Sequence, residues 1–370
     1  MITNQSLPKE NLAALMFTSG STGTPKAVMI SQENIIANTE SIINFLSIKD
    51  SDKIFTSLPL HYCFGASLLH THLRAGGTIV FNSFKNTKPM LDYMFNSGAN
   101  ALAGVPSFFQ ILLRNSITLK HDFSSIKKIQ QAGGKLASIF VKELDDLFSE
   151  AEVFLMYGQT EATARLSYLP PDMIYKKLGS IGKGIPGCQL KIQITNRVED
   201  SKAIGEILAK GANVSLGYWQ ENNKNNKLFT DDGWLRTGDL GYKDKDGYIF
   251  IVGREKSFIK SGGHRCSSLM IEDYLLQHAD IIEVGIVGIP DQIRGEAICA
   301  FIVAKEFVKL TKKEVITFCK QQLPRYMIPK HISFLEELPK NDAGKILKSF
   351  LKELSIATFS NEYRMLTLKK

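Results

Sequence analysis

The sequence predicts an α/β fold in which a sheet layered with helices is followed by a small β-barrel-like subdomain and a compact α+β domain. In the first half, apolar segments of strand length alternate with helical stretches, as expected for a layered sheet. Beyond about residue 179 the strands become short and alternating, with Gly, Asn and Asp between them, which is typical of a barrel or an antiparallel subdomain. The expected domains span residues 1–178, 179–254 and 257–370.

The first expected elements are a strand, a loop and a second strand. Residues 12–18, LAALMFT, predict a buried strand that ends in a Gly/Ser/Thr loop, and AVMI at 27–30 predicts another short strand. Ser31 is then a suitable helix N-cap, with Glu33 in the first turn. The face of that helix comprises Ile35, Thr39, Ile42, Ile43 and Leu46. The later strands of this domain are IFTSLP, GGTIVF, ANALAGV, KKIQQAGG and AEVFLMYG.

The second half of the chain predicts shorter elements. QLKIQIT, GEILAKG and YIFIVG are the strands of the barrel-like subdomain, and the polar stretch ENNKNNK at 221–227 is expected to be a loop. In the last domain we expect a helix near 269–278, two strands, IIEVGIVGI and AICAFIVA, and a helix that starts at Thr311.

Composition excludes several classes of protein. The chain has 370 residues, 44% of them hydrophobic, as in ordinary globular proteins of about two or three domains. The net charge of +8 is scattered, with only pairs such as Lys127-Lys128, so it favours anionic small molecules or a lineage bias over nucleic acid. Five cysteines without a C-x-x-C pair argue against a disulfide framework and a zinc site. No apolar run would span a bilayer and the first residues are polar, so a cytoplasmic protein is expected.

The segment TSGSTGTPK, from Thr18 to Lys26, carries the clearest chemistry. Its two glycines let the backbone wrap closely around a ligand, while N–H groups, hydroxyls and Lys26 form a cradle for an anion. It does not fit the Walker A pattern. Because an apolar strand leads into it and another strand follows, a phosphate-binding loop is favoured over a surface linker.

This loop resembles the phosphate-binding loop of the acyl-adenylate-forming superfamily, which includes acyl-CoA synthetases, luciferases and nonribosomal adenylation domains. Four more family patterns follow in family order, and the resemblance covers residues from about 8 to 355. These patterns are YGQTEA at 157–162, GWLRTGDL at 233–240, GY and GR at 247–248 and 253–254, and LPKNDAGK at 338–345.

The resemblance implies that ATP is bound and assigns its contacts. The β- and γ-phosphates would be held by Thr18, Ser19, Gly20, Ser21, Thr22, Gly23 and Lys26. Gly133 and Gly134 would lie against adenine, with Tyr157 packed on it, and Asp239 and Arg254 would contact the ribose.

The resemblance also implies catalytic roles for three motif residues. Thr160 would contact phosphate, Glu161 would ligate Mg²⁺ and Lys345 would bridge the substrate carboxylate and the α-phosphate. These residue types suit the reaction, because a carboxylate that attacks ATP brings two anions together and Mg²⁺ prefers oxygen ligands. Taken alone, Glu161 or Asp239 would be interpreted as a solvated loop acid, and only the ordered motifs favour the functional interpretation.

A second half-reaction would transfer the acyl group to a thiol. Family members rotate the C-terminal domain between the two steps, and Ser257 stands at the hinge where the family often has Asp. Gly262 and Gly263 resemble the glycine pair that lets pantetheine approach. The next residues, CSSLMIE, depart from the usual V-x-P-x-E-I-E, which leaves this step open. CoA is the favoured acceptor, and the phosphopantetheine of a carrier protein is the alternative.

The substrate class is indicated by FGAS at residues 64–67. Relatives that activate amino acids carry F-D-x-S, and their Asp pairs with the substrate amine. Gly65 stands in place of that Asp, and a buried ammonium without a partner would be costly, so a carboxylic acid without an α-amino group is favoured. His61 corresponds to a family histidine near the acyl pocket, with a purely structural role as the alternative.

Two weaker patterns are set aside. GKGIPG at 182–187 spells G-x-G-x-x-G, but a proline and a strand follow it instead of a helix, so a Rossmann site is not expected. His70 and His72 lie two residues apart on a predicted helix, so their side chains point apart and no third ligand is evident.

Family members normally carry a long region before the phosphate loop, so the large domain is expected to be incomplete and the chain N-terminally truncated. A fragment, one half of a two-chain enzyme with a complementing N-terminal chain, and a shortened, repacked protein are the three interpretations. The rival class is an inactive fragment or a non-catalytic binding or partner subunit. The intact Lys345, Glu161 and phosphate loop favour the enzyme.

Overall fold

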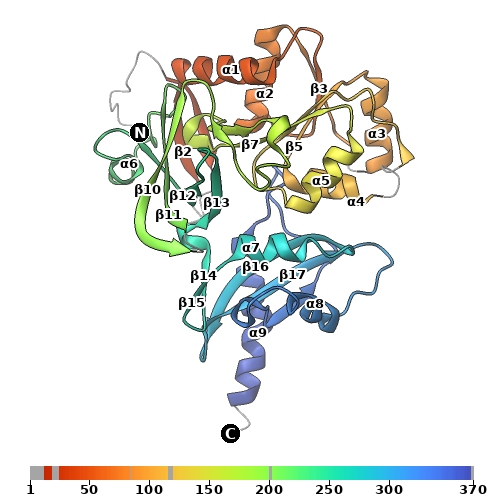
Figure 1. Ribbon diagram of the computed structural model, residues 1–370, viewed down its shortest axis with the longest axis vertical. Helices are drawn as coiled ribbons and strands as arrows, with labels where there is room; N and C mark the ends of the chain where they lie inside the picture. The colour runs from red at the N-terminus through yellow and green to blue at the C-terminus, as the bar shows by residue number, and fades with distance from the viewer. Residues whose placement is uncertain (1–11, 19–24, 85, 116–119, 200–201, 368–370) are drawn as a thin grey trace, which may run out of the picture. The chain divides into compact units, whose positions relative to one another are not determined.

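The computed structural model describes residues 12–18, 25–84, 86–115, 120–199 and 202–367. The chain forms two compact units (Figure 1). The first unit contains Met1–Gly104, His121–Lys135 and Phe148–Ile251, and the second contains Val105–Lys120, Leu136–Leu147 and Val252–Lys370. Within the described residues, no helix combines the length and the apolar composition that crossing a membrane would require.

The first unit is built on a seven-stranded sheet of order β4-β3-β5-β6-β7-β8-β9. Neighbours from β4 to β7 are parallel, and β8 and β9 add two antiparallel pairings at one end. All four residues of β5 are buried, as expected for a parallel strand covered on both faces. The strands are β3 (Lys53–Thr56), β4 (Thr78–Phe81), β5 (Ala101–Gly104), β6 (Lys128–Gln131), β7 (Glu152–Tyr157), β8 (Ser167–Leu169) and β9 (Lys183–Gly184). The helices of this unit are α1 (Gln32–Leu46), α2 (Cys63–Ala75), α3 (Thr87–Asn96) and α6 (Asn222–Leu228).

A separate two-stranded sheet pairs β1 (Leu12–Thr18) with β2 (Lys26–Ser31) antiparallel. The expected strand at 12–18 is present, but it is not fully buried, because half-buried and exposed residues alternate along it and Phe17 is 65% exposed. Ser31 caps α1 as expected, since its side chain accepts a hydrogen bond from the Asn34 backbone N–H. The Asn34 side chain completes a reciprocal capping box.

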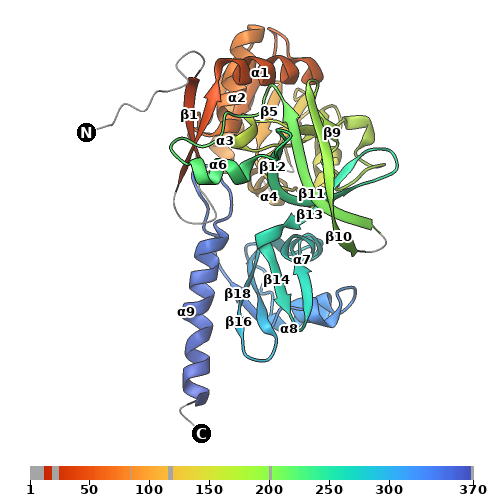
Figure 2. The ribbon, with the colours of Figure 1, turned by 90° about the vertical axis from the view of Figure 1, so that its left-hand side faces the viewer.

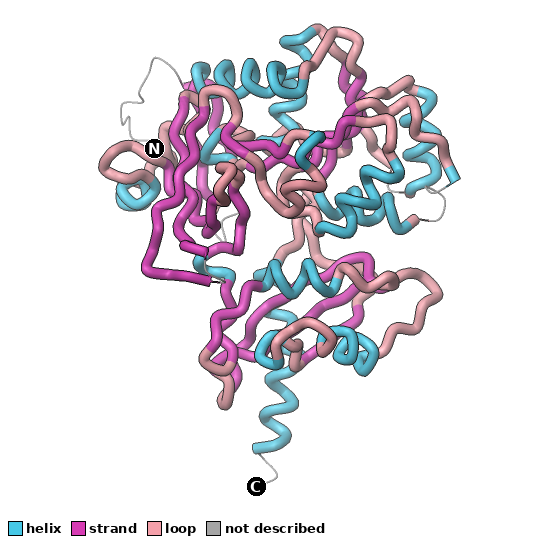
Figure 3. The backbone as a smooth tube through the Cα atoms, viewed as in Figure 1, coloured by secondary structure: helices cyan, strands magenta, loops and turns pink. Residues whose placement is uncertain are grey.

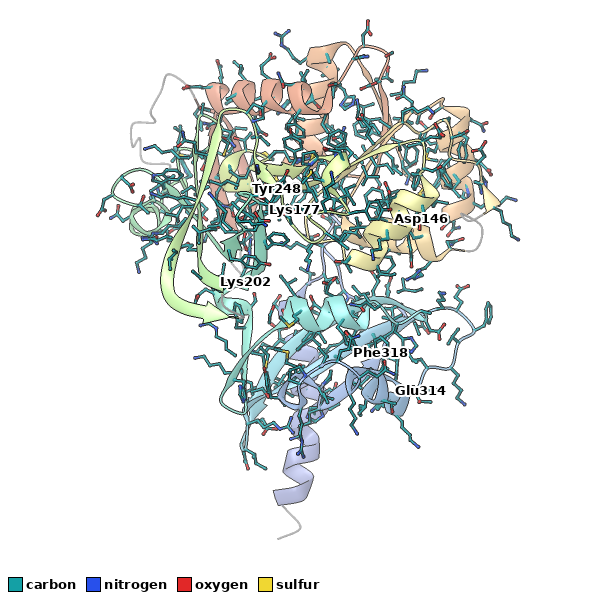
Figure 4. All side chains as sticks on the ribbon, in the orientation of Figure 1. Asp146, Lys177, Lys202, Tyr248, Glu314 and Phe318 are labelled. Atoms are coloured by element: carbon teal, nitrogen blue, oxygen red, sulfur yellow. The ribbon has the colours of Figure 1, made fainter. Side chains whose placement is uncertain are left out.

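The expected β-barrel is an antiparallel sheet of four strands in the open order β10-β11-β12-β13 (Figure 2), so the barrel prediction is wrong for the described strands. Its strands are β10 (Cys188–Glu199), β11 (Lys202–Gly211), β12 (Leu235–Lys243) and β13 (Ile249–Arg254). A turn precedes β13, and Lys177 stabilises it: its Nζ lies 2.7 Å from Asp244 Oδ2 and 5.1 Å from the centroid of the Tyr248 ring (Figure 4).

The segment expected to be a loop at 221–227 is largely helical and belongs to α6 (Figure 3). Tertiary contacts outweigh its weak helix propensity. Leu228 is buried in a core cluster that also contains Tyr218, and the Asn225 side chain accepts from Tyr218 N at 2.6 Å and donates to Tyr218 O at 2.8 Å. The loop prediction is therefore wrong, because the cluster that buries Leu228 includes residues as distant in sequence as Val28 and Ala162.

The second unit contains a five-stranded sheet of order β15-β14-β17-β16, with β18 parallel to β17. The strands are β14 (Phe258–Ser261), β15 (His264–Ser267), β16 (Ile281–Asp291), β17 (Gly295–Ala304) and β18 (His331–Phe334). The helices are α4 (Pro106–Arg114), α5 (Ser138–Leu147), α7 (Ser268–Leu275), α8 (Lys312–Cys319) and α9 (Lys348–Thr367). The helix expected from Thr311 is present as α8, and Thr311 caps it in a capping box with Glu314.

Candidate functional site

The ends of the Ser/Gly/Thr segment lie opposite each other at one end of the β1–β2 hairpin, where Thr18 pairs with Lys26. The Lys26 ammonium lies 4.5 Å from the centroid of the Tyr218 ring, a cation–π contact. The segment therefore connects two antiparallel strands, as expected from the apolar strands on either side. Five of the predicted phosphate-contacting residues lie outside the described residues, namely Ser19, Gly20, Ser21, Thr22 and Gly23.

The predicted Tyr157-to-Glu161 segment forms a tight turn at the carboxyl end of β7, the side on which open α/β sheets bind ligands. The chain folds back at once, and Leu166 N donates to Tyr157 O at 2.8 Å. A Cβ atom at Gly158 would lie only 1.8 Å from the Ala164 carbonyl oxygen, so only glycine fits there. The short 3₁₀ turn that follows, Thr160–Ala162, carries two of the predicted catalytic residues.

Thr160 is buried and connects this turn to α2. Its hydroxyl donates to Cys63 Sγ at 3.5 Å. Burial raises the pKa of the Cys63 thiol, so the sulfur stays protonated at neutral pH. His61, the predicted pocket histidine, is exposed in the turn just before α2. The structure thus places Thr160 beside the first turn of α2. Its contact there, Cys63, follows His61 by two residues in the sequence.

Glu161 is held in place by a residue that the sequence did not single out. The Tyr218 hydroxyl donates to Glu161 Oε1 at 2.6 Å, and Ser215 N donates to the Glu161 backbone oxygen at 3.0 Å. The carboxylate is therefore oriented without an ion pair from any described residue. An oriented carboxylate of this kind provides the hard oxygen ligand that Mg²⁺ prefers.

Two residues with different predicted roles contact each other directly. The Tyr157 hydroxyl donates to Asp239 Oδ2 at 2.6 Å, and Asp239 is buried on β12. Asp239 N also donates to Thr237 Oγ1 at 3.2 Å. The tyrosine predicted to pack on adenine and the aspartate predicted to bind ribose are therefore hydrogen-bonded to each other, although they are 82 residues apart in the sequence.

The predicted adenine-contacting pair, Gly133 and Gly134, lies just after β6, at the same carboxyl edge of the sheet as Tyr157. Gln131 shapes this loop, because its side-chain Nε2 donates to the Gly134 carbonyl oxygen at 3.0 Å. Because both residues are glycines, they present only backbone atoms at this edge.

The predicted hinge and thiol-approach residues belong to the second unit, as does Arg254, the predicted ribose contact. Arg254 ends β13, and the exposed Ser257 ends the 3₁₀ turn Glu255–Ser257. Gly262 and Gly263 form the two-residue turn between β14 and β15, with φ values of 60° and 80°. Both angles are positive, which favours glycine, and a Cβ at either position would meet nothing within 4 Å. The hairpin geometry thus explains the glycines, and the open space leaves room for a ligand.

Lys345 is exposed in a loop whose backbone is hydrogen-bonded to the Asn341 side chain. Asn341 Oδ1 accepts hydrogen bonds from Ala343 N at 3.1 Å and from Lys345 N at 2.9 Å. Before the loop, Lys340 Nζ lies 2.7 Å from Oε1 of the buried Glu283. Burial raises the pKa of the Glu283 carboxyl, and the Lys340 charge opposes that rise.

Beyond the loop, a second ion pair holds the start of α9. Lys348 Nζ lies 2.6 Å from Glu272 Oε1 and 3.0 Å from Ser268 Oγ. The Lys345 loop is therefore fixed at both ends by lysine–glutamate pairs. Neither pair is evident from the sequence, because no local pattern connects the partners.

Comparison with known proteins identifies the family to which the chain belongs. The AMP-binding enzyme model matches residues 2–219, more than half of the chain, and the AMP-binding enzyme C-terminal domain model matches residues 270–345. A long-chain-fatty-acid–CoA ligase of Salmonella typhimurium is 34% identical over 352 residues, which are 93% of this chain and 62% of that protein. The chain thus spans about three fifths of the length of this curated relative.

Other similar proteins include a 2-succinylbenzoate–CoA ligase of Bacillus mycoides, 31% identical over 93% of this chain and 70% of that protein. Among solved structures, the o-succinylbenzoate CoA synthetase of Bacillus subtilis in complex with its acyl-adenylate has a TM-score of 0.79 and 31% identity, with 91% of this chain and 68% of that chain covered. With these similarities and the matched models, the chain belongs to the AMP-binding enzyme family, whose members include acyl-CoA ligases.

Proposed function

We propose that the chain activates a carboxylic acid without an α-amino group as its acyl-adenylate, with ATP, and then transfers the acyl group to a thiol, with CoA as the favoured acceptor. The main support is the polar array at the carboxyl end of β7. Thr160 and Glu161 lie in one short turn there, Tyr218 orients Glu161, and Tyr157 at the end of β7 is hydrogen-bonded to Asp239. Similar proteins are named as CoA ligases, and one similar structure is described in complex with ATP and a magnesium ion.

The residues around this array suit a bound Mg²⁺–ATP. Glu161 offers the oxygen that would hold Mg²⁺, which supplies positive charge to the phosphates when bound. Lys26 and the Thr18 end of the phosphate loop would contact the outer phosphates, and Asp239 would accept hydrogen bonds from the ribose. Lys26 and the Mg²⁺ held by Glu161 would thus neutralise phosphate charge, and Asp239 would position the nucleotide.

The chemistry that follows is a displacement at phosphorus. An oxygen of the substrate carboxylate attacks the α-phosphate, the bond to the β-phosphate oxygen breaks, and pyrophosphate leaves. Because both reactants are anions, positioning and charge neutralisation account for most of the acceleration. Lys345, in its hydrogen-bonded loop, would bridge the carboxylate and the α-phosphate. In the second step a thiol replaces AMP, and Gly262 and Gly263 would leave space for the arm that carries it.

Gly65 supports an acid without an amine. It is buried near the start of α2, and a Cβ at this position would lie 2.1 Å from the Pro59 carbonyl oxygen. An aspartate therefore does not fit here unless the turn before α2 moves, so no carboxylate at this position pairs with a substrate ammonium. ATP–pyrophosphate exchange with fatty, aryl and amino acids tests the proposal. Preferred exchange with an amino acid would overturn it, as would the absence of exchange with every acid.

Asp239→Ala is expected to weaken ATP binding more than it slows bound turnover, because ribose contacts are similar in the ground and transition states. Tyr157→Phe removes only the hydrogen bond to Asp239 and is expected to have the smaller effect, about tenfold or less in KM for ATP. Steady-state kinetics with varied ATP measures both variants. An unchanged KM with a collapsed kcat in Asp239→Ala would remove the ribose assignment.

The alternative acceptor is the phosphopantetheine of a carrier protein, and thioester formation assayed with CoA and with a loaded carrier separates the two. The rival from another class is a non-catalytic binding or partner subunit, for which ATP would bind without exchange. A complementing chain would find an apolar surface on β1, where Leu15 and Phe17 are exposed on one face. Light scattering of the purified chain over a range of concentrations tests this surface, and a monodisperse, fully active monomer argues against it.

A further inference from the structure

Arg165 is the largest fully buried side chain of the described residues, with 1% of its surface exposed. It stands four residues after Glu161, between the predicted catalytic turn and β8. Its guanidinium carbon lies 4.0 Å from the centroid of the Phe64 ring, and its Nε donates to Met156 Sδ at 3.3 Å. Its Nη2 has no hydrogen-bond partner among the residues that the structure describes. An aromatic ring and a thioether therefore surround a cation that has no strong acceptor.

Other shielded cations of the described chain differ from Arg165 because each has a carboxylate. Arg114 Nη1 lies 2.5 Å from Glu143 Oε2, Lys128 Nζ lies 2.8 Å from Asp52 Oδ2, and Lys177 Nζ lies 2.7 Å from Asp244 Oδ2. For Arg165 the described residues provide no such ion pair. Burial lowers the pKa of the Arg165 guanidinium to about 10, so it remains charged at neutral pH. A charge that is buried and unpaired costs far more than a paired one, and a bound anion would remove that cost.

The position of Arg165 relates it to the reacting end of the substrate. Cys63 contacts the Thr160 hydroxyl, and the next residue, Phe64, carries the Arg165 guanidinium on its ring. The first turn of α2 therefore contacts both groups. A small acid whose reacting carboxylate lies near Thr160 would need only a short chain to place another group at Arg165.

We propose that Arg165 is a specificity-determining residue that binds a second carboxylate of the substrate, so that the chain activates short dicarboxylic acids. The inference rests on the proposed adenylation and names its substrate class. A guanidinium suits this role because its fork of N–H donors matches the two oxygens of a carboxylate. The Phe64 ring and Met156 contact the guanidinium without neutralising its charge.

The test is pyrophosphate exchange with chain-matched acids, namely butyrate against succinate, valerate against glutarate and hexanoate against adipate. The unmodified chain is expected to prefer the best dicarboxylate over its matched monocarboxylate by about 10²-fold in kcat/KM, because a site built for a polar group rejects the analogue that lacks it. Arg165→Met should abolish the preference, and Arg165→Lys, which keeps the charge without the fork, should restore part of it. Arg114→Met removes a shielded arginine elsewhere and should leave the preference unchanged.

A merely structural role for Arg165 would lower activity with both acids of a pair equally. Equal use of both acids by the unmodified chain, a preference for monocarboxylates, or an unchanged preference in Arg165→Met would each overturn the inference, and the first two need no variant to fold. If no acid supports exchange, the proposed adenylation fails, and the inference is then decided by binding. In that case the dicarboxylates should raise the Tm of the unmodified chain in the presence of ATP while their matched monocarboxylates do not, and no difference within a pair would overturn it.

Discussion

Replacing Lys345 with alanine is expected to slow adenylation by about 10²–10³-fold while ATP affinity changes little, the loss typical of removing one charge-stabilising donor. The reason is that the Lys345 ammonium would act mainly as charge develops between the carboxylate and the α-phosphate. The loop should survive the change, since Asn341 binds the backbone N–H of residue 345 and the ion pair of Lys340 with Glu283 is untouched. Pyrophosphate exchange and ATP titration measure the two quantities.

A second readout separates this role from general damage. Thioester formation from preformed acyl-adenylate does not involve attack on ATP, so Lys345→Ala should retain it. Lys352→Ala, which changes an exposed lysine of α9, is the matched control and should leave both steps intact. Full exchange in Lys345→Ala would remove Lys345 from the mechanism, whereas equal loss of both steps would indicate a structural effect.

Gly158→Ala is expected to destabilise the first unit by about 3 kcal/mol or more and to abolish exchange, at the upper end of the range for overpacking. The added Cβ would lie 1.8 Å from the Ala164 carbonyl oxygen and 2.8 Å from Arg165 Cα, both of which belong to the backbone and cannot rotate away. The turn that carries Thr160 and Glu161 would have to open. Thermal unfolding and pyrophosphate exchange measure the two effects.

Gly285→Ala is the matched control for crowding. Its Cβ would meet Leu351 Cδ1 at 2.4 Å, but this atom is the end of a flexible side chain that can move. The loss of stability should therefore be clearly smaller, and ATP binding by the first unit should persist. Wild-type stability in Gly158→Ala would show that the turn tolerates a side chain and that its geometry does not depend on glycine.

Local patterns were sufficient for much of the fold. Ser31 caps the helix at which it was placed, because a capping side chain bonds to a backbone N–H only three residues away, and the helix expected from Thr311 is present as well. The parallel strands of the first unit also follow from their apolar runs. The segments that carry Tyr157, Asp239 and Lys345 were identified from the resemblance, since each is a contiguous stretch of sequence.

Tertiary structure decided the features that depend on distant residues. The sequence does not reveal that Tyr218 holds Glu161 or that Tyr157 bonds to Asp239, because each pair is separated by more than fifty residues. The helix α6 forms through packing of Leu228, against a local composition that favours a loop. The open order of β10 to β13 likewise depends on strand pairing, since short alternating strands are compatible with both an open sheet and a barrel.

Arg165 shows the same division most clearly. In the sequence, Arg165 is one basic residue of a positively charged chain, and its sequence neighbours do not predict that it is buried. Its isolation results from Phe64 on α2 and Met156 on β7, which surround its guanidinium from different elements. Local sequence determines which residues can cap, turn or form strands through short-range backbone bonds. Whether a buried charge is paired or unpaired depends on which distant side chains the fold places around it. Burial and electrostatic pairing are properties of the three-dimensional surroundings.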